Sequence, residues 1–321
     1  MNVNINKQEV IIIKVLSLFD GMSCGRIALE KIGITPLVYY ASEIKDDAIQ
    51  VTQENYPDTI QLGDITELSN ERIQMLGNID LLIGGSPCQN VSQAMKKEYR
   101  NGLKGDKSKL FFEYVRVLKE VKPKYFLLEN VGSMTKEDKM TVSELLGVEP
   151  IRINSKLVSP QLRNRLYWTN IPNITQPEDK NIMLNDILTE GWSDREKARC
   201  LLESDSRPLT SPLKMFHRYR KFNTLVFKSE EHYKKCVAHY NENFKGMSAK
   251  EIDESGIISD VYDGVRYLNQ EELEALQTVP KGYTSSLTRN QAAGLLGDGW
   301  TVDVIAHILS FMKTGVKPLR L

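Results

Sequence analysis

Residues 11–25 read IIIKVLSLFDGMSCG, a short aliphatic run that ends in a turn rich in glycine. A run of this length and composition is typical of a buried strand. A segment with helical character begins at Arg26, without a linker. The stretch therefore predicts a strand, a tight turn and a helix.

The same alternation continues through the first half of the chain. Further strand-like runs occupy residues 36–43, 60–64, 79–87 and 125–131, and segments with helical or polar character separate them. Alternating strands and helices build a parallel sheet that helices cover on both faces. We therefore expect an α/β fold with a Rossmann-like, mostly parallel sheet.

Residues suited to chemistry follow these strands, namely Asp20, Glu43, Asp64, Cys88 and Glu129. Ligands of such sheets bind beyond the carboxyl ends of the strands, so we expect these side chains to face one crevice. An acidic residue after the second strand can bind ribose hydroxyls. Asp64 could accept a hydrogen bond from an adenine amino group, or it could cap a helix. The sequence lacks the GxxxxGK[ST] phosphate loop, which argues against ATP or GTP.

The segment GGSPCQN makes Cys88 a candidate nucleophile, because two upstream glycines give its loop backbone freedom. The alternative is a small buried cysteine without a chemical role. Glu129 interrupts a very apolar strand, and a desolvated carboxyl group there could protonate or hydrogen-bond a ring nitrogen.

The segment QLRNR, residues 161–165, would place Gln161, Arg163 and Arg165 on one face if it were extended. Two guanidinium groups could then hold a phosphate, a carbonyl oxygen or a thiolate. A solvated edge strand is the alternative interpretation.

The alternation fades in the second half, and we expect three segments. Residues 1–175 would form the first part of a catalytic domain, residues 176–265 a separate small domain, and residues 266–321 a return to the first. The last segment contains a capped helix after Asn269 and two helical stretches around GDGW. In the small domain, KMFHRYRKF at residues 214–222 mixes cations with aromatic rings, which suits DNA contact or an ordinary amphipathic surface.

Composition limits the function classes. Lysine plus arginine and aspartate plus glutamate number 42 each, so no overall basic field indicates a nucleic-acid partner, although a local basic cleft is compatible with this balance. No apolar run reaches the ~18 residues that span a membrane, and the polar start lacks a secretory signal pattern. The 4 cysteines are scattered without metal-ligand spacing. We therefore expect a cytoplasmic protein without a metal or a membrane partner.

The motifs FDGMSCG, SEIKDD, GD, GGSPCQNVSQA, ENV, QLRNR, RYLNQEELEALQTVP and GDGW occur in this order. Together they resemble the motif series of the cytosine-5 DNA methyltransferases. The SLFDG start, the SPC loop and the LLGDGW ending look most like de novo-type members and phage or bacterial enzymes. The likeness covers the chain except for the region near residues 172–265.

The resemblance implies a class I fold that uses S-adenosylmethionine, together with a small target-recognition domain. It implies methyl transfer to carbon 5 of a cytosine flipped out of duplex DNA, through a covalent cysteine adduct. The catalytic roles of the family fall on Cys88, Glu129, Arg163 and Arg165. The cofactor roles fall on Phe19, Asp20, Gly21, Cys24, Glu43, Ile44, Asp64, Ile65, Leu110, Asp298, Gly299 and Trp300.

DNA contacts are expected from the segment after Cys88, a basic stretch that we interpret as a lid, and from the small domain. These candidates are Gln89, Ser92, Lys96, Arg100, Arg218 and Arg220. Double-stranded DNA is the expected partner, in a bacterial or phage-infected cell, and a cognate restriction endonuclease is a candidate second partner in this family.

Two departures from the family pattern concern the cofactor. Many bacterial members carry paired glycines where this chain has Ser23 and Cys24, and many carry asparagine and serine at Asp298 and Gly299. These positions put the details of cofactor binding in question.

Other functions remain as alternatives. A tRNA cytosine-5 methyltransferase shares most motifs, but the CFT tripeptide typical of that branch is missing. Amino-methylating DNA enzymes carry a PPY loop, whereas this chain has SPCQ. A catalytically silent DNA-binding module would be expected to lack the nucleophile or the acid, and both Cys88 and Glu129 are present.

Overall fold

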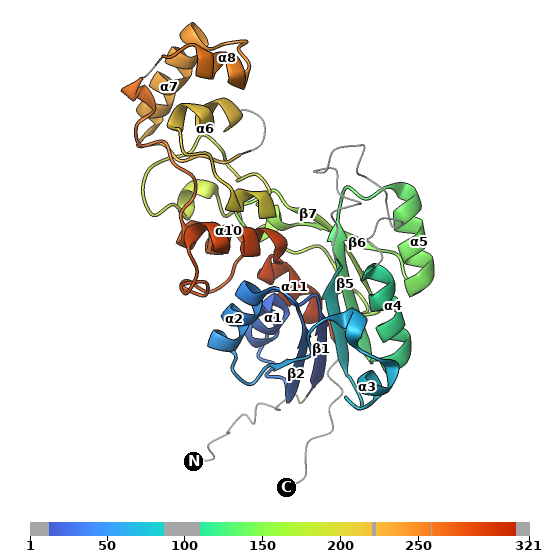
Figure 1. The fold of residues 1–321 in the computed structure, drawn as a ribbon. Helices are drawn as coiled ribbons and strands as arrows, with labels where there is room; N and C mark the ends of the chain where they lie inside the picture. The colour runs from blue at the N-terminus through green and yellow to red at the C-terminus, as the bar shows by residue number, and fades with distance from the viewer. Residues whose placement is uncertain (1–12, 87–109, 220–222, 258, 313–321) are drawn as a thin grey trace, which may run out of the picture. The chain divides into compact units, whose positions relative to one another are not determined.

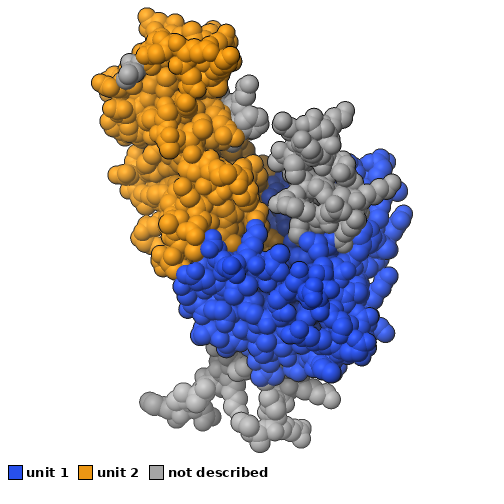
Figure 2. Space-filling model, in the orientation of Figure 1, with its two compact units in different colours: residues 1–153, 164–177, 302–321 blue, residues 154–163, 178–301 orange. Residues whose placement is uncertain are grey.

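The computed structural model describes residues 13–86, 110–219, 223–257 and 259–312. The chain divides into two compact units, which Figure 2 colours separately. Unit 1 consists of Met1–Ile153, Asn164–Pro177 and Val302–Leu321, and unit 2 of Asn154–Arg163 and Glu178–Thr301. The expected small domain therefore lies in a larger unit, because residues 154–163 and 266–301 cluster with it. A role in target recognition stays a prediction.

The described part of unit 1 is built on a seven-stranded sheet with the order β3-β2-β1-β4-β5-β7-β6 (Figure 1). Its strands are β1 (Lys14–Leu18), β2 (Val38–Ser42), β3 (Ile60–Gln61), β4 (Leu81–Gly85), β5 (Tyr125–Val131), β6 (Ile151–Asn154) and β7 (Asn164–Thr169). The pairs from β3 through β5 are parallel, and β5 pairs with β7 in antiparallel orientation. The expected mostly parallel sheet is confirmed.

Helices cover both faces of this sheet. Figure 1 shows α1 (Cys24–Lys31), α2 (Asp46–Asn55) and α11 (Val302–Leu309) on one face, and α3 (Asn70–Gln74), α4 (Leu110–Val121) and α5 (Lys136–Leu146) on the other. The C-terminal helix α11 is tied to α1 by an ion pair of 2.6 Å between Lys31 and Asp303. The helices α1 and α11, which lie far apart in the sequence, therefore belong to the same helical layer of unit 1.

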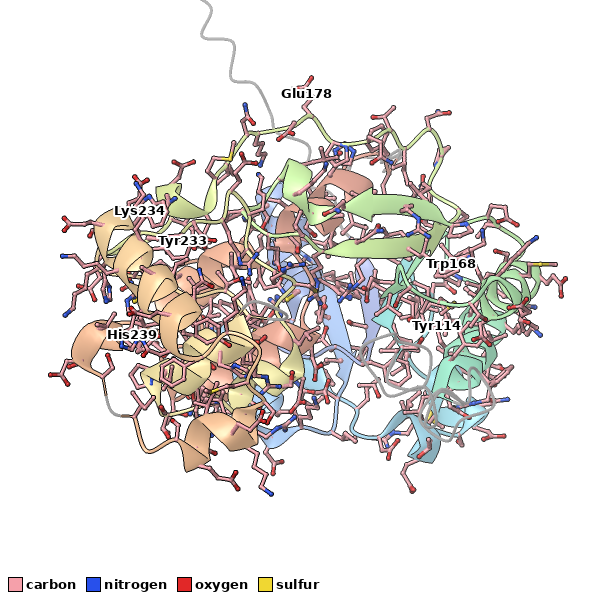
Figure 3. The ribbon with its side chains drawn as sticks, turned by 90° about the horizontal axis from the view of Figure 1, so that it is seen from above. Tyr114, Trp168, Glu178, Tyr233, Lys234 and His239 are labelled. Atoms are coloured by element: carbon pink, nitrogen blue, oxygen red, sulfur yellow. The ribbon has the colours of Figure 1, made fainter. Side chains whose placement is uncertain are left out.

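The core of unit 1 lies between the sheet and α4. Tyr114 on α4 and Trp168 on β7 belong to one buried cluster, and Figure 3 labels both rings. Burying aliphatic and aromatic side chains of this size stabilises a fold by about 1.5–3 kcal/mol each. Gly84 in β4 makes room for this packing, since a Cβ there would lie 3.0 Å from the Tyr114 ring and from the Leu18 carbonyl oxygen. The glycine pair before Cys88 therefore lies at the end of β4. Glycine is required at position 84 because Tyr114 and Leu18 approach its Cα closely, whereas the sequence had indicated backbone freedom of the loop.

Unit 2 contains five further α-helices among its described residues. They are α6 (Pro212–Tyr219), α7 (Glu230–Asn243), α8 (Ala249–Glu254), α9 (Gln270–Leu276) and α10 (Arg289–Asp298). Short 3-10 helices occur in both units: η1 (Ile65–Glu67), η4 (Ser155–Leu157), η5 (Leu184–Asp186), η6 (Glu203–Ser206) and η7 (Asp260–Tyr262). The predicted cap of α9 is confirmed, because the Asn269 side chain accepts a hydrogen bond from the Glu272 backbone N–H at 3.0 Å.

Part of unit 2 has a hydrophobic core of its own. Phe216 from α6, Cys236 and Tyr240 from α7, and Tyr262 belong to this cluster. His239, labelled on α7 in Figure 3, has its Nδ1 atom 3.1 Å from the Tyr262 hydroxyl oxygen. None of the helices in the described ranges is long and apolar enough to span a bilayer.

Candidate active site

The ends of the central strands meet at one edge of the sheet. Leu18 is in register with Ser42 of β2 and with Gly84 of β4, and Gly85 is in register with Glu129 of β5. The residues that follow β1, β2 and β4 therefore share an edge with Glu129. The register brings Asp20, Glu43 and Glu129 to the same edge of the sheet, and the expectation that their side chains face one crevice stays a prediction.

The turn after β1 has an unusual backbone. Phe19, Gly21 and Ser23 have φ angles of 55°, 60° and 59°. Only glycine adopts this left-handed region without strain, and for other residues it costs about 1–2 kcal/mol. The turn must therefore be held by interactions that offset this cost.

Asp20 supplies part of that support. Its carboxylate accepts hydrogen bonds from the Ser23 hydroxyl at 2.5 Å and the Tyr39 hydroxyl at 2.7 Å. Its backbone N–H donates to the Ser42 carbonyl at 3.2 Å. Burial raises the pKa of Asp20 to about 6, although the hydroxyls of Ser23 and Tyr39 oppose that rise. Asp20 is thus engaged within the turn, and it titrates not far below neutral pH.

Glu43 links this turn to the end of β2. Its Oε2 atom accepts from the Gly21 N–H at 2.8 Å, and Oε1 accepts from the N–H groups of Ile44 at 2.7 Å and Lys45 at 3.0 Å. A carboxylate offers about four lone-pair positions, so these three bonds orient the group and leave capacity for a further donor. Ile44 beside it is 67% exposed, so its side chain is accessible to a ligand.

Asp64, after β3, acts as the cap that the sequence had offered as one alternative. Its Oδ1 atom accepts from the backbone N–H and the hydroxyl of Thr66, both at 2.8 Å, and so begins η1. Ile65 is buried, and its carbonyl oxygen accepts from Arg116 at 3.1 Å. An adenine contact by Asp64 is compatible with this geometry and stays a prediction.

Two other expected cofactor residues of unit 1 flank this region. Cys24 is buried as the first residue of α1. Leu110 is half-buried as the first residue of α4 and packs against the main core. Their roles toward a ligand stay predictions.

Glu129 forms an ion pair with Arg165, whose Nε atom lies 2.8 Å from Oε1. The side chains are only 11% and 12% exposed. The pair forms because β5 and β7 are antiparallel neighbours, with Val131 opposite Arg165. The Arg165 guanidinium thus lies directly beside the Glu129 carboxyl group, whereas the sequence analysis had considered only the desolvation of Glu129.

Asn130 is a site residue that the sequence analysis did not select. Its side-chain amide donates to the carbonyl oxygen of Ser86 at 3.3 Å and to the hydroxyl of Ser86 at 3.1 Å. Ser86 lies two positions before Cys88 in the chain. The sequence feature that could have identified Asn130 is the ENV motif, in which it follows Glu129 as a second polar residue in a buried strand.

The QLRNR segment does not form one extended face. β7 begins only at Asn164, and Gln161 and Arg163 are buried in unit 2. The Arg163 guanidinium donates to the carbonyl oxygens of Leu201 at 2.9 Å and Gly299 at 2.7 Å. Of the three side chains expected on one face, only Arg165 lies in the strand beside Glu129.

Asp298, Gly299 and Trp300 belong to unit 2, at the end of α10. Asp298 is exposed and Trp300 is buried. Arg218 is exposed on α6, whose Phe216 is buried, so α6 has the form of an amphipathic surface helix. The remaining predicted residues lie outside the described residues: Cys88, Gln89, Ser92, Lys96, Arg100 and Arg220.

Comparison with protein families gives one matching model, described as C-5 cytosine-specific DNA methylase, over residues 13–148. The type II methyltransferase M.NlaIV of Neisseria lactamica is 33% identical over 208 residues, which cover 56% of this chain and 48% of that protein. The orphan methyltransferase M.SPRI of Bacillus phage SPR is 27% identical over 308 residues, covering 92% of this chain and 58% of that protein. The chain thus spans about half the length of these relatives.

Solved structures of similar fold include the Entamoeba histolytica methyltransferase EhMeth, with a TM-score of 0.68 and 16% identity, covering 93% of this chain and 97% of that one. A putative DNA modification methyltransferase from an Escherichia coli prophage gives a TM-score of 0.59 and 18% identity, covering 94% and 98%. At such identities the likeness concerns the fold alone. It agrees with a class I methyltransferase architecture.

Proposed function

We propose that this chain is a member of the cytosine-5 DNA methyltransferase family and that it transfers a methyl group from S-adenosylmethionine to carbon 5 of cytosine in duplex DNA. The observation that carries the proposal is the meeting of two sets of groups at one edge of the sheet. One set is the glycine turn anchored by Glu43. The other is the Glu129–Arg165 pair near the end of β5, which β4 separates from β1 in the same sheet.

The residues around Glu43 fit an adenosine-type cofactor. An oriented carboxylate suits a ribose diol, and the exposed Ile44 side chain suits the face of an adenine ring. At Gly21 a Cβ would meet no heavy atom within 4 Å, so a ligand can approach the backbone there. S-adenosylmethionine bound here would supply an electrophilic methyl group on its sulfonium. Phe19 and Asp64 are the other proposed contacts.

In the proposed reaction the Cys88 thiolate adds to carbon 6 of the flipped cytosine, which makes carbon 5 nucleophilic. Glu129 holds or supplies a proton at ring nitrogen 3, and Arg165 fixes the orientation of that carboxyl group. After carbon 5 has taken the methyl group, loss of its proton expels the cysteine. Cys88 enters this scheme from its sequence motif, since it lies outside the described residues.

The QLRNR motif implied a catalytic role for Arg163, whereas its contacts support a positioning role. Its guanidinium is buried and donates to carbonyl oxygens of unit 2, including that of Gly299 in the GDGW segment. Hydrogen bonds from a charged donor are worth about 1.5–3 kcal/mol. We therefore assign Arg163 as a positioning residue for that segment, and we keep Arg165 as the arginine that acts with Glu129.

The test is methyl transfer from tritiated S-adenosylmethionine to duplex DNA, single-stranded DNA and tRNA, in parallel. We expect label at cytosine carbon 5 of duplex DNA carrying varied sequences, and no label with Cys88→Ala. Cys236→Ala is the matched control, because Cys236 is a buried core thiol outside the proposed site. Methylation of tRNA without methylation of either DNA would show that tRNA, and not DNA, is the substrate. Cofactor binding without transfer to any of the three would contradict the proposed activity.

A further inference from the structure

Unit 2 contains a small pocket that has no role in the proposed function, although Tyr267 and three leucines of its lining lie in the RYLNQEELEALQTVP motif. Its volume is about 20 Å³, and its polar lining includes Arg199, Asn223, Thr224, Tyr267 and Arg289. Four leucines, Cys200 and Asp205 complete the lining. A space of this size admits a group no larger than a water molecule, and it is too small for a nucleobase.

The pocket is rich in hydrogen-bond donors. The Thr224 hydroxyl oxygen accepts from the Arg199 backbone N–H at 2.9 Å. The Tyr267 hydroxyl oxygen accepts from the Asn223 amide at 3.2 Å and from the Leu209 N–H at 3.4 Å. A hydroxyl whose oxygen already accepts still has one hydrogen to donate. The site therefore suits a ligand that only accepts hydrogen bonds.

The charges favour an anion. Arg289 is held in place by hydrogen bonds to the carbonyl oxygens of Leu268 and Asp205, both at 3.0 Å, and lies over the Tyr267 ring at 5.6 Å. Arg199 is exposed, and among the described residues no carboxylate forms an ion pair with it. A guanidinium fork is matched to the oxygens of a phosphate or a carboxylate.

Asp205 is the one acidic residue of the lining, and it is engaged elsewhere. Its Oδ2 atom accepts from the Leu202 backbone N–H at 2.8 Å, at the start of η6. Burial raises the pKa of Asp205, while the charges of Arg289 and Arg218 oppose that rise. The lining thus carries two guanidinium groups against one partly buried carboxyl group.

We propose that this pocket binds an oxygen of a DNA backbone phosphate, with Arg199, Thr224 and Tyr267 as donors and Arg289 as a fixed second charge. The inference rests on duplex DNA being the substrate. A phosphate oxygen has the size, the charge and the purely accepting character that the pocket requires. Such a contact anchors unit 2 on the duplex without regard to base sequence.

The experiment is equilibrium binding of the full chain to a fluorescent duplex over a series of salt concentrations. Arg199→Gln is compared with the wild type and with Lys250→Ala, which removes one positive charge from an exposed position on α8 of the same unit. We expect Arg199→Gln to weaken binding roughly tenfold or more, as for a lost charged hydrogen bond. We also expect it to reduce the slope of log Kd against log salt by about 1. Lys250→Ala should change neither quantity.

Thr224→Val provides a second variant that keeps the charge and the shape of the pocket. We expect it to weaken binding severalfold with the salt slope unchanged, because it removes the hydroxyl donor and the acceptor of the Arg199 backbone N–H but no charge. Methyl transfer by the wild type is measured alongside. If the wild type binds and methylates duplex DNA while Arg199→Gln keeps its affinity and salt slope, the phosphate pocket is refuted and the proposed function stands. If the wild type neither binds nor methylates DNA, both proposals fall.

Discussion

The Nε atom of Arg165 lies 2.8 Å from the Oε1 atom of Glu129, and both side chains are almost completely buried. The contact joins the last parallel strand, β5, to its antiparallel neighbour β7. When two charges are buried in this way, the loss of either one destabilises the fold, because the other is left buried without a counter-charge. The pair therefore connects the stability of unit 1 to the proposed chemistry at Glu129.

Arg165→Met should expose this connection. The substitution keeps much of the side-chain volume and leaves the Glu129 carboxylate buried without its cation. We expect the free energy of unfolding to fall by about 3 kcal/mol, as is typical when one partner of a buried pair is lost. Urea denaturation followed by fluorescence measures this change.

The double variant Arg165→Met/Glu129→Gln separates stability from catalysis. Removing both charges should restore most of the lost stability, since no unpaired charge remains. Methyl transfer should nevertheless stay at least about 100-fold below the wild type, because the acid at ring nitrogen 3 is absent. Full activity in the double variant would remove Glu129 from the proposed mechanism.

Ser23 permits a matched comparison at the glycine turn. It has a φ of 59°, and its hydroxyl bonds to Asp20 at 2.5 Å and to Thr52 at 3.1 Å. Ser23→Ala loses both bonds and keeps the strain, whereas Ser23→Gly loses the same bonds and relieves the strain. We expect Ser23→Ala to be less stable than Ser23→Gly by about 1 kcal/mol in denaturant unfolding. Equal stabilities would mean that the turn relaxes in the variants.

Sequence reasoning succeeded where a local pattern has one dominant physical outcome. The aliphatic run before Phe19 could hardly be anything except a buried strand, and parallel strands bring their ends to one edge. The Asn269 cap was likewise determined by a short-range rule, since its partner Glu272 is three residues away. These features need no knowledge of distant contacts.

The sequence was less informative where a side chain's partner lies far along the chain. The alternation in QLRNR gave no sign that Arg163 would bond to Gly299, 136 residues away, while Arg165 would pair with Glu129. In the same way, the sequence analysis explained the glycine pair by backbone freedom of the loop, whereas the need for Gly84 comes from its close approach to Tyr114 on α4. Such roles are set by packing between elements, which periodicity does not encode.

The pH dependence of stability should carry a signature of Asp20. Its folded-state pKa is raised from 3.8 to about 6 by burial, so the folded protein binds this proton more tightly than the unfolded chain does. Stability from this group is therefore greatest below pH 4 and is lost as the pH rises through 6. Relative to Asp20→Asn, the wild type should lose up to about 3 kcal/mol between pH 4 and 7. The comparison of the two proteins at each pH cancels the other carboxylates, and a constant difference would contradict the assignment.

The contact between α10 and η6 provides the last prediction. At Gly297 a Cβ would overlap the backbone of Leu202, which cannot move aside without displacing η6. At Gly294, one turn earlier, the nearest atom to a Cβ would be the Ser206 Cβ at 3.1 Å, and the Glu203 carbonyl oxygen would lie at an ordinary contact distance of 3.7 Å. We expect Gly297→Ala to destabilise the protein by about 3 kcal/mol, the upper end for overpacking, and Gly294→Ala by less than about 1 kcal/mol. Thermal unfolding of the two variants measures the difference.

Because Arg163 donates hydrogen bonds to the carbonyl oxygens of Gly297 and Gly299, Gly297→Ala should also weaken binding of S-adenosylmethionine if the GDGW segment contributes to the cofactor site. Equal behaviour of the two alanine variants in both measurements would show that α10 does not depend on close approach at Gly297.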